Sequence, residues 1–246
     1  MDNNKLNYTY DNIIQVDESA TAKKFMANVF LWMFLALAIS AVCAYEAAYN
    51  NEVFSALYDP INGGRTGLGT LVMFAPLAFI LAMSFGLQRL SYGVLVILFI
   101  AFSAVMGVSI SSIFMLYSLK AILGVFASTS LLFGVMAIAG YTTHTDLTKF
   151  GSLMMMGLFG VIIASVVNWF MHSEQLAYII SFVGVAVFIG LTAYDVQKLK
   201  QLSQTEDIDG TLKSKLGLMG ALNLYLDFLN LFLMLLRLFG GGRGRN

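Results

Sequence analysis

The chain of 246 residues is 59% hydrophobic and 11% charged, and its formal net charge is zero. A mean hydropathy of +0.79 is too high for a soluble globular protein. The balanced charge gives no electrostatic basis for binding nucleic acid. The single cysteine, Cys43, cannot form an internal disulfide, so the cysteine content does not indicate an oxidising or a reducing compartment. The composition therefore indicates an integral membrane protein.

The first segment, residues 1–22, is polar, rich in Asn and Asp and without apolar periodicity, which predicts a disordered tail. Seven apolar runs follow it, each long enough to cross a hydrocarbon core about 30 Å thick as an α-helix. The first run is too long, and begins too far from the N-terminus, for a cleaved signal peptide. We expect an all-α, seven-helix membrane domain over residues 23–239 and a Gly/Arg-rich tail at 240–246. The runs cover residues 25–45, 66–88, 90–119, 121–143, 150–171, 175–194 and 216–236.

Small and polar residues mark packing faces and turns between these runs. Ser103, Gly107 and Ser111 are spaced four apart in the third run, and Gly124 and Ser128 repeat the spacing in the fourth. Small residues at this spacing let membrane helices approach closely, so we interpret both sets as packing features. A turn is expected where Pro60 and an Asn-Gly-Gly sequence fall together at 60–64, and a short solvated loop around His144 and Asp146.

The distribution of Lys and Arg predicts the orientation of the chain. With a cytoplasmic N-terminus, the outer loops carry only Arg65 and Lys120. Seven spans then place the arginines of the C-terminal end outside, whereas a re-entrant last segment would return them to the cytoplasm. We favour seven spans. The basic residues on the inner side would be Lys5, Lys23, Lys24, Arg89, Lys149, Lys198, Lys200, Lys213 and Lys215.

Two aspartates interrupt the last two apolar runs, Asp195 near the end of the sixth and Asp227 within the seventh. A carboxylate inside a membrane helix costs a few kcal/mol, so it is a candidate functional residue by default. Asn223, Asp227 and Asn230, together with Arg237, fall within an arc of about 80° on one helix face. The remaining surface of that helix is Leu, Phe, Met and Tyr. This polar stripe predicts a cavity or helix contact rather than lipid.

Spacing alone does not bring the two aspartates together. At 1.5 Å per residue, Asp195 lies roughly 6 Å inside the inner boundary and Asp227 roughly 18 Å. Contact would require the seventh span to begin in the cytoplasm, or a water-filled vestibule. Arg89 closes the second run at a depth similar to that of Asp195, so it either pairs with this aspartate or faces lipid headgroups.

If the two carboxyl groups did approach, they would share one proton, because two adjacent carboxylates do not both ionise cheaply in a low dielectric. Protonation would hold the helices together. Deprotonation would separate them and expose oxygens able to attract a hard cation such as Ca²⁺, which describes a pH-gated cation pathway. The alternative is that each aspartate serves packing on its own.

Several segments resemble the Bax inhibitor-1 family of membrane proteins, in its bacterial branch. The resemblance is carried by AYDVQKLK at 193–200 and LNLYLDFLNLFLMLLRLFG at 222–240, with PLAFILAMSFGLQRLS at 76–91, GVSISSIF at 107–114 and GYTTHTDLTKFGS at 140–152. It implies seven helices with the last one enclosed by the other six, in the bacterial inner (plasma) membrane.

The same resemblance implies a pH-sensitive calcium leak across the membrane, gated by an aspartate dyad. Asp195 and Asp227 occupy the two positions of that dyad, and Arg89 matches an arginine that latches to the first aspartate. Ca²⁺ and protons would be the ions handled, with no cofactor. Other family members are tied to a membrane-bound quality-control protease. An alternative is therefore a non-conducting regulator, similar to suppressors of stress or cell death, that binds a membrane protease or other membrane partner through the polar N-terminal tail.

The sequence around the two aspartates does not match the catalytic motifs of intramembrane enzymes. Asp227 stands in Tyr-Leu-Asp rather than in the Gly-x-Gly-Asp context of intramembrane aspartyl proteases, and neither proline lies downstream of it. The sequence also lacks a Gly-x-Ser-Gly element and a cluster of metal ligands. A retinal receptor is disfavoured because the last span has no lysine at mid-depth, Lys215 being at its edge. We expect a protein that is not an enzyme.

Overall fold

The computed structural model describes residues 3–59, 64–205 and 208–241. These residues form an all-α structure, and seven helical segments are long and apolar enough to cross a membrane, as predicted. Pro60 and the tail beyond residue 241 lie outside the described residues. The helices are α1 (Asn3–Tyr49), α2 (Asn51–Leu57), α3 (Gly67–Gly86), α4 (Tyr92–Ile110), α5 (Ile113–Leu116), α6 (Leu119–Thr142), α7 (Thr148–Met171), α8 (Glu174–Ser203) and α9 (Gly210–Phe239).

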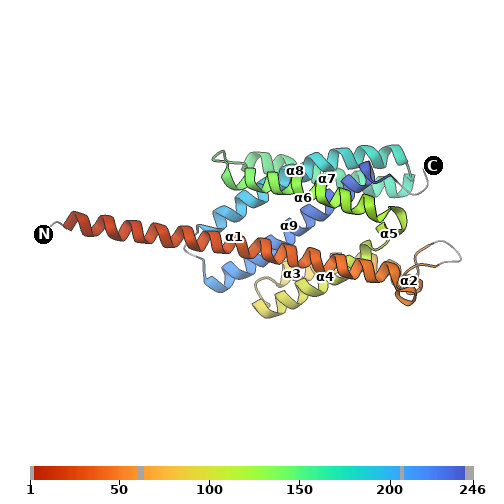
Figure 1. The fold of residues 1–246 in the computed structure, drawn as a ribbon, viewed down its shortest axis with the longest axis horizontal. Coiled ribbons are helices and arrows are strands. Elements are labelled where there is room, and N and C mark those ends of the chain that lie inside the picture. Colours follow the sequence, from red (N-terminus) through yellow and green to blue (C-terminus); the bar gives the residue numbers. More distant parts are fainter. Residues whose placement is uncertain (1–2, 60–63, 206–207, 242–246) are drawn as a thin grey trace.

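Helix α1 begins well before the membrane span that it contains. The span starts at Ala20, but the helix starts at Asn3. Residues 3–22 are therefore helical, whereas the sequence predicted a disordered tail. Residues 1–49 contain neither Gly nor Pro. Because the apolar part already supplies a helical nucleus, each further turn avoids the cost of nucleation. Figure 1 shows this N-terminal part of α1 extending past the other helices.

Helix α9 runs between two groups of helices, as Figure 1 shows. On one side are α1, α3 and α4, and on the other α6, α7 and α8. Its main contacts are with α8, α1, α6 and α4. In its most apolar window 67% of the residues are buried, against 11% to 50% in the other spans. Helices α3 and α7 pack chiefly on α4 and α8, so enclosure of α9 by all six other spans stays a prediction.

Glycines allow two close helix crossings in the bundle. A side chain at Gly107 of α4 would collide with the backbone of Ser40 in α1, and one at Gly140 of α6 with the backbone of Ala193 in α8. The packing role predicted for Gly107 is thus confirmed. Such contacts hold α1 to α4 and α6 to α8 at the short distance that small residues permit.

The packing role predicted for Gly124 and Ser128 is wrong for contacts between helices of this chain. Both residues are exposed, and the space that a side chain at Gly124 would occupy is open. Helix α6 instead turns Val125, Thr129 and Phe133 toward the core. The outward face of α6 also carries large apolar residues such as Leu131 and Ile138, as expected where a helix faces lipid, so apolar size alone does not decide which face points inward.

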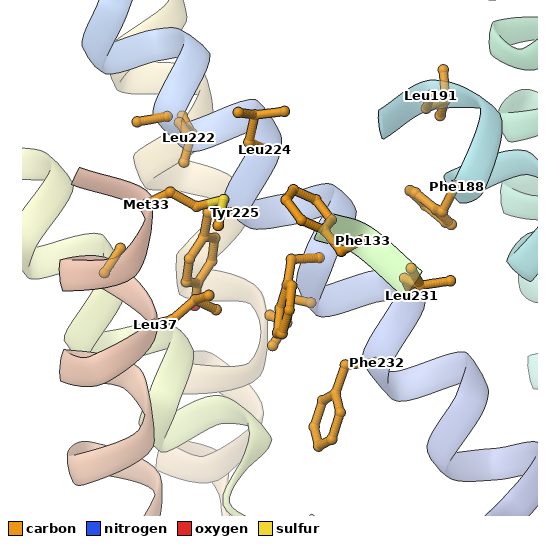
Figure 2. Close-up of a cluster of buried hydrophobic side chains, with 14 of the residues drawn as sticks. Met33, Leu37, Phe133, Phe188, Leu191, Leu222, Leu224, Tyr225, Leu231 and Phe232 are labelled. Atoms are coloured by element: carbon orange, nitrogen blue, oxygen red, sulfur yellow. The ribbon is translucent and has the colours of Figure 1, made fainter. Parts of the chain in front are cut away.

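The centre of the bundle is built around Tyr225 of α9, whose side chain is fully buried. Figure 2 shows its ring beside Met33 and Leu37 of α1. Its hydroxyl lies 2.7 Å from the Ser40 hydroxyl, and Ser40 donates a hydrogen bond to the Ser103 carbonyl of α4 at 2.6 Å. Because the Ser40 hydroxyl hydrogen is used in this bond, the Tyr225 hydroxyl is the donor to Ser40. This network fixes one face of α9 against α1 and α4.

Candidate functional site

The register of the α8–α9 hairpin places the two aspartates at the same level. Gly220 of α9 contacts Leu199 of α8, and farther along Gly184 contacts Met234. Leu199 lies about one turn before the end of α8, whereas Gly220 lies almost three turns after the start of α9. On the side of the connecting loop, the first residue of α9 therefore lies about two turns farther out than the last residue of α8. The difference in depth expected from spacing disappears because the two helices do not begin at a common boundary.

The first turns of α9 explain why it can begin there. Residues 210–215 are Gly-Thr-Leu-Lys-Ser-Lys, which are mostly polar. Asp209 accepts hydrogen bonds from the backbone N–H groups of Thr211 and Leu212, and so caps the helix. The ammonium group of Lys213 donates to the carbonyls of Ser203 and Thr205, at 2.7 and 3.0 Å. These bonds satisfy carbonyls at the end of α8 and tie the two helices together.

The carboxyl groups of Asp195 and Asp227 lie within hydrogen-bonding reach of each other. Asp227 is 6% exposed, and Asp195 is half-buried. The Oδ2 atom of Asp227 has no hydrogen-bond donor among the described residues. Ionised carboxylates only accept hydrogen bonds, so a bond between these groups requires a proton on one of them. The arrangement fits a pair that holds one proton.

A cavity of about 910 Å³ adjoins this pair. Its walls come from α3, α7, α8 and α9, and most of the lining side chains are apolar. Asn223, Asp227 and Asn230 all line it, as expected for the polar stripe, whereas Arg237 is exposed and is not among the lining residues. The other polar or ionisable residues of the lining are Ser165, Tyr194, Asp195 and Lys198.

A second cavity of about 390 Å³ lies between α8 and α9 on the side of their connecting loop. Asp195, Lys198 and Asn223 line both cavities. The smaller cavity is otherwise bounded by residues such as Gln201 and Thr205, at the polar end of the hairpin. Asp195 thus lies where two spaces meet, one toward the α8–α9 loop and one within the membrane-spanning part, and Asp227 lines the second of these.

Arg89 has an exposed side chain in the turn that follows α3. In the described part of the chain no ion pair joins it to Asp195, and the latch role stays a prediction. The basic residue that lines both cavities with Asp195 is Lys198, one turn later on α8. Its spacing of three residues from Asp195 on a helix is the signal by which the sequence could have identified it.

Helix α8 also holds the loop between α6 and α7. The buried side chain of Gln197 donates to the Thr145 carbonyl and accepts from the Leu147 N–H, both at 2.8 Å. His144 and Asp146 of this loop are exposed, as expected for a solvated turn. Hydrogen bonds from Thr148 hold the pKa of Asp146 below its usual value. The role of Gln197 was not apparent from the sequence because its partners are backbone atoms about fifty residues away.

The described residues contain no group of three or more His, Cys, Asp and Glu side chains arranged to hold a metal ion. Ca²⁺ in a resident site takes about six to eight oxygen ligands. Asp195, Asp227 and the amides of Asn223 and Asn230 offer fewer.

Seven apolar helices around a buried carboxyl pair define the class, a polytopic helical membrane protein with an intramembrane polar site. Residues 22–244 match the family model described as "Inhibitor of apoptosis-promoting Bax1". The chain is 42% identical to the inner membrane protein YbhL of Escherichia coli K12, over 95% of this chain and 97% of that protein. Uncharacterized proteins of Borreliella burgdorferi and Rickettsia prowazekii are 42% and 38% identical, over 89% and 90% of this chain and 93% and 91% of their own. The chain belongs to the Bax inhibitor-1 family.

Proposed function

We propose that this protein is a pH-sensitive leak pathway for cations, with Ca²⁺ as the main candidate ion. The observation that carries the proposal is the position of Asp195 and Asp227, in mutual hydrogen-bonding reach where two cavities meet. The family membership and the name of the inner membrane relative support a location in the plasma membrane.

In the closed state the pair holds one proton, and the shared hydrogen bond ties α8 to α9. Loss of this proton leaves two carboxylates side by side. Two like charges about 4 Å apart repel by about 4 kcal/mol at an effective dielectric constant of about 20, which exceeds the strength of most single helix contacts. The helices then separate at the aspartates and the two cavities join. Flux therefore rises as the pH rises.

The polar residues of the two cavities provide the path on either side of the gate. Asn223 and Asn230 supply carbonyl oxygens about two turns apart on α9, with Asp227 between them. Lys198 lies on the loop side of Asp195 and lines both cavities with it. In the open state the two carboxylates outweigh this single positive charge, so the path attracts cations over anions.

Purified protein in liposomes that contain a Ca²⁺-sensitive dye tests the proposal. We expect a Ca²⁺ flux that increases with pH, and loss of this pH dependence in Asp195→Asn and Asp227→Asn. The matched control is Glu174→Gln, which removes an exposed carboxylate from the start of α8, outside both cavities. A flux with the same pH dependence in both aspartate variants would remove these residues from the gate.

A second candidate, a regulator that binds a membrane partner such as a protease, is favoured by the N-terminal part of α1. This segment extends past the other helices as a helix (Figure 1), which makes it available to a partner. Deletion of residues 2–22 separates the two functions. A regulator loses its partner but the protein keeps any Ca²⁺ flux, whereas a pathway that needs this segment loses flux as well.

A further inference from the structure

The larger cavity opens sideways between α3 and α7. Phe74 and Leu77 of α3 and Ile162 and Trp169 of α7 line it, and their exposed fractions lie between 48% and 62%. The two helices pack chiefly on α4 and α8 and lie on opposite sides of α9 in Figure 1. Because both helices are membrane spans, the opening faces the hydrocarbon phase. A molecule dissolved in the bilayer can therefore reach the cavity without passing through water.

The inner wall of the cavity, formed by α8 and α9, is more polar than the sides formed by α3 and α7. Apolar residues line the α3 and α7 sides almost throughout, whereas the α8–α9 wall carries the carboxyl groups of Asp195 and Asp227. Asp227 is almost fully buried, and its Oδ2 lacks a donor among the described residues. A buried carboxyl oxygen without a partner is unfavourable, because no hydrogen bond offsets its loss of contact with water. A ligand that brought N–H donors to this oxygen would recover that cost.

We propose that this cavity binds a single-chain amphiphile with a primary ammonium head, such as a long-chain alkylamine. The ammonium group donates hydrogen bonds to the two carboxyl groups, and the alkyl chain lies between α3 and α7 in the direction of Trp169. A volume of about 910 Å³ is sufficient for one such molecule. The ligand enters from the lipid through the opening between the two helices.

The chemistry of the site selects against other amphiphiles. An alcohol has one donor and no charge, and a fully ionised carboxylate brings no hydrogen-bond donor to the carboxyl oxygens. A phospholipid with an ethanolamine head carries an ammonium group, but its phosphate stays at the membrane surface. Asp195 lies about two turns inside the end of α8, which keeps that headgroup away from the pair. The occupant is therefore a free amine rather than a bilayer lipid.

Fluorescence quenching of Trp169 tests the proposal. The chain has two tryptophans, so Trp32→Phe leaves Trp169 as the reporter at the cavity wall. The protein is placed in phosphatidylcholine nanodiscs and titrated with 12-bromododecylamine or, for comparison, 12-bromododecanol. We expect half-maximal quenching by the amine at a mole fraction about tenfold lower than by the alcohol, from hydrogen bonds to a charged partner. Equal quenching by the two compounds would overturn the proposal.

Variants assign the effect to the site. Asp227→Asn should abolish the preference for the amine. Ser165→Phe, which fills the cavity, should reduce quenching by the amine. Its matched control is Ser128→Phe on the exposed face of α6, because both serine hydroxyls donate only to the carbonyl four residues earlier. A preference that survives Asp227→Asn, or that Ser128→Phe reduces as much as Ser165→Phe, would contradict the assignment.

A final arm replaces phosphatidylcholine by phosphatidylethanolamine. Unchanged quenching by the amine supports the free amine, whereas its loss would show that a lipid headgroup occupies the site and that the proposal is wrong. The inference uses the same carboxyl pair as the proposed cation pathway but does not depend on conduction. Amine-selective quenching without Ca²⁺ flux would support this site and refute the pathway. A pH-dependent Ca²⁺ flux without amine-selective quenching would support the pathway and refute this site.

Discussion

The hydroxyl groups of Tyr225 and Ser40 lie 2.7 Å apart in the middle of the bundle, and this contact fixes α9 to α1. Tyr225 precedes Asp227 by two residues, so their side chains leave α9 about 160° apart. One face of α9 is thus anchored by the tyrosine while the other presents the carboxyl group to α8. We expect α8 to be the helix that moves when the aspartates separate.

Loss of the tyrosine hydroxyl should destabilise the protein modestly. Tyr225→Phe removes one buried hydrogen bond, which is worth about 0.5–1.5 kcal/mol in a helical membrane protein. The change leaves the ring packing and the bond from Ser40 to the Ser103 carbonyl in place. Equilibrium unfolding in mixed micelles with increasing sodium dodecyl sulfate measures the free energy of unfolding.

The control for this substitution is Tyr178→Phe, because Tyr178 is 56% exposed on α8. It should leave the free energy of unfolding unchanged within about 0.5 kcal/mol. If Tyr225→Phe proved as stable as the parent protein, the contact with Ser40 would not anchor α9.

The crossing of α6 and α8 should not tolerate a single added methyl group. In Gly140→Ala the new methyl meets the Ala193 carbonyl, and the helices must move apart at a cost of about 1–3 kcal/mol. Gly134→Ala on the same helix is the control, since no atom lies within 4 Å of the position of its new methyl group. Thermal unfolding of both variants should show a drop for Gly140→Ala alone. Equal melting temperatures would mean that the crossing is looser than described.

The number of spans and the polar stripe of α9 were predictable because each depends on a single helix. Run length decides whether a helix crosses the membrane, and the spacing of Asn223, Asp227 and Asn230 decides that they share a face. The contact between Asp195 and Asp227 was not predictable in this way. It depends on where α9 begins relative to the end of α8, and the polar turns that set this look like an ordinary loop in the sequence.

The same limit explains two other differences. Arg89 was assigned a depth similar to that of Asp195, but depth alone does not say which side chain lies beside Asp195, and in the structure Lys198 of the same helix lines both cavities with this aspartate. Gly124 and Ser128 have the spacing of a packing face, yet α6 turns another face, which carries Phe133, toward the other helices. In both cases the packing between helices that are distant in the sequence decides which residues face each other, and spacing along one helix does not reveal it.

Removal of the Gln197 side-chain bonds should release the loop between α6 and α7. In Gln197→Leu the Leu147 N–H loses its acceptor and the Thr145 carbonyl its donor. Amide hydrogen exchange at Leu147 should become at least about tenfold faster, as expected for loss of a buried hydrogen bond. Gln201→Leu, at an exposed position one turn later, is the control and should leave this exchange rate unchanged. An unchanged rate in Gln197→Leu would show that other contacts hold the loop.

The separation of the Asp195 and Asp227 carboxyl groups at acidic and at alkaline pH tests the proposed gate most directly. It can be read from structures of the protein determined in lipid nanodiscs under the two conditions. We expect carboxyl groups in hydrogen-bonding reach at acidic pH, and a clear separation at alkaline pH with the two cavities joined. Carboxyl groups that stay in contact at both pH values, or that stay apart at both, would contradict it.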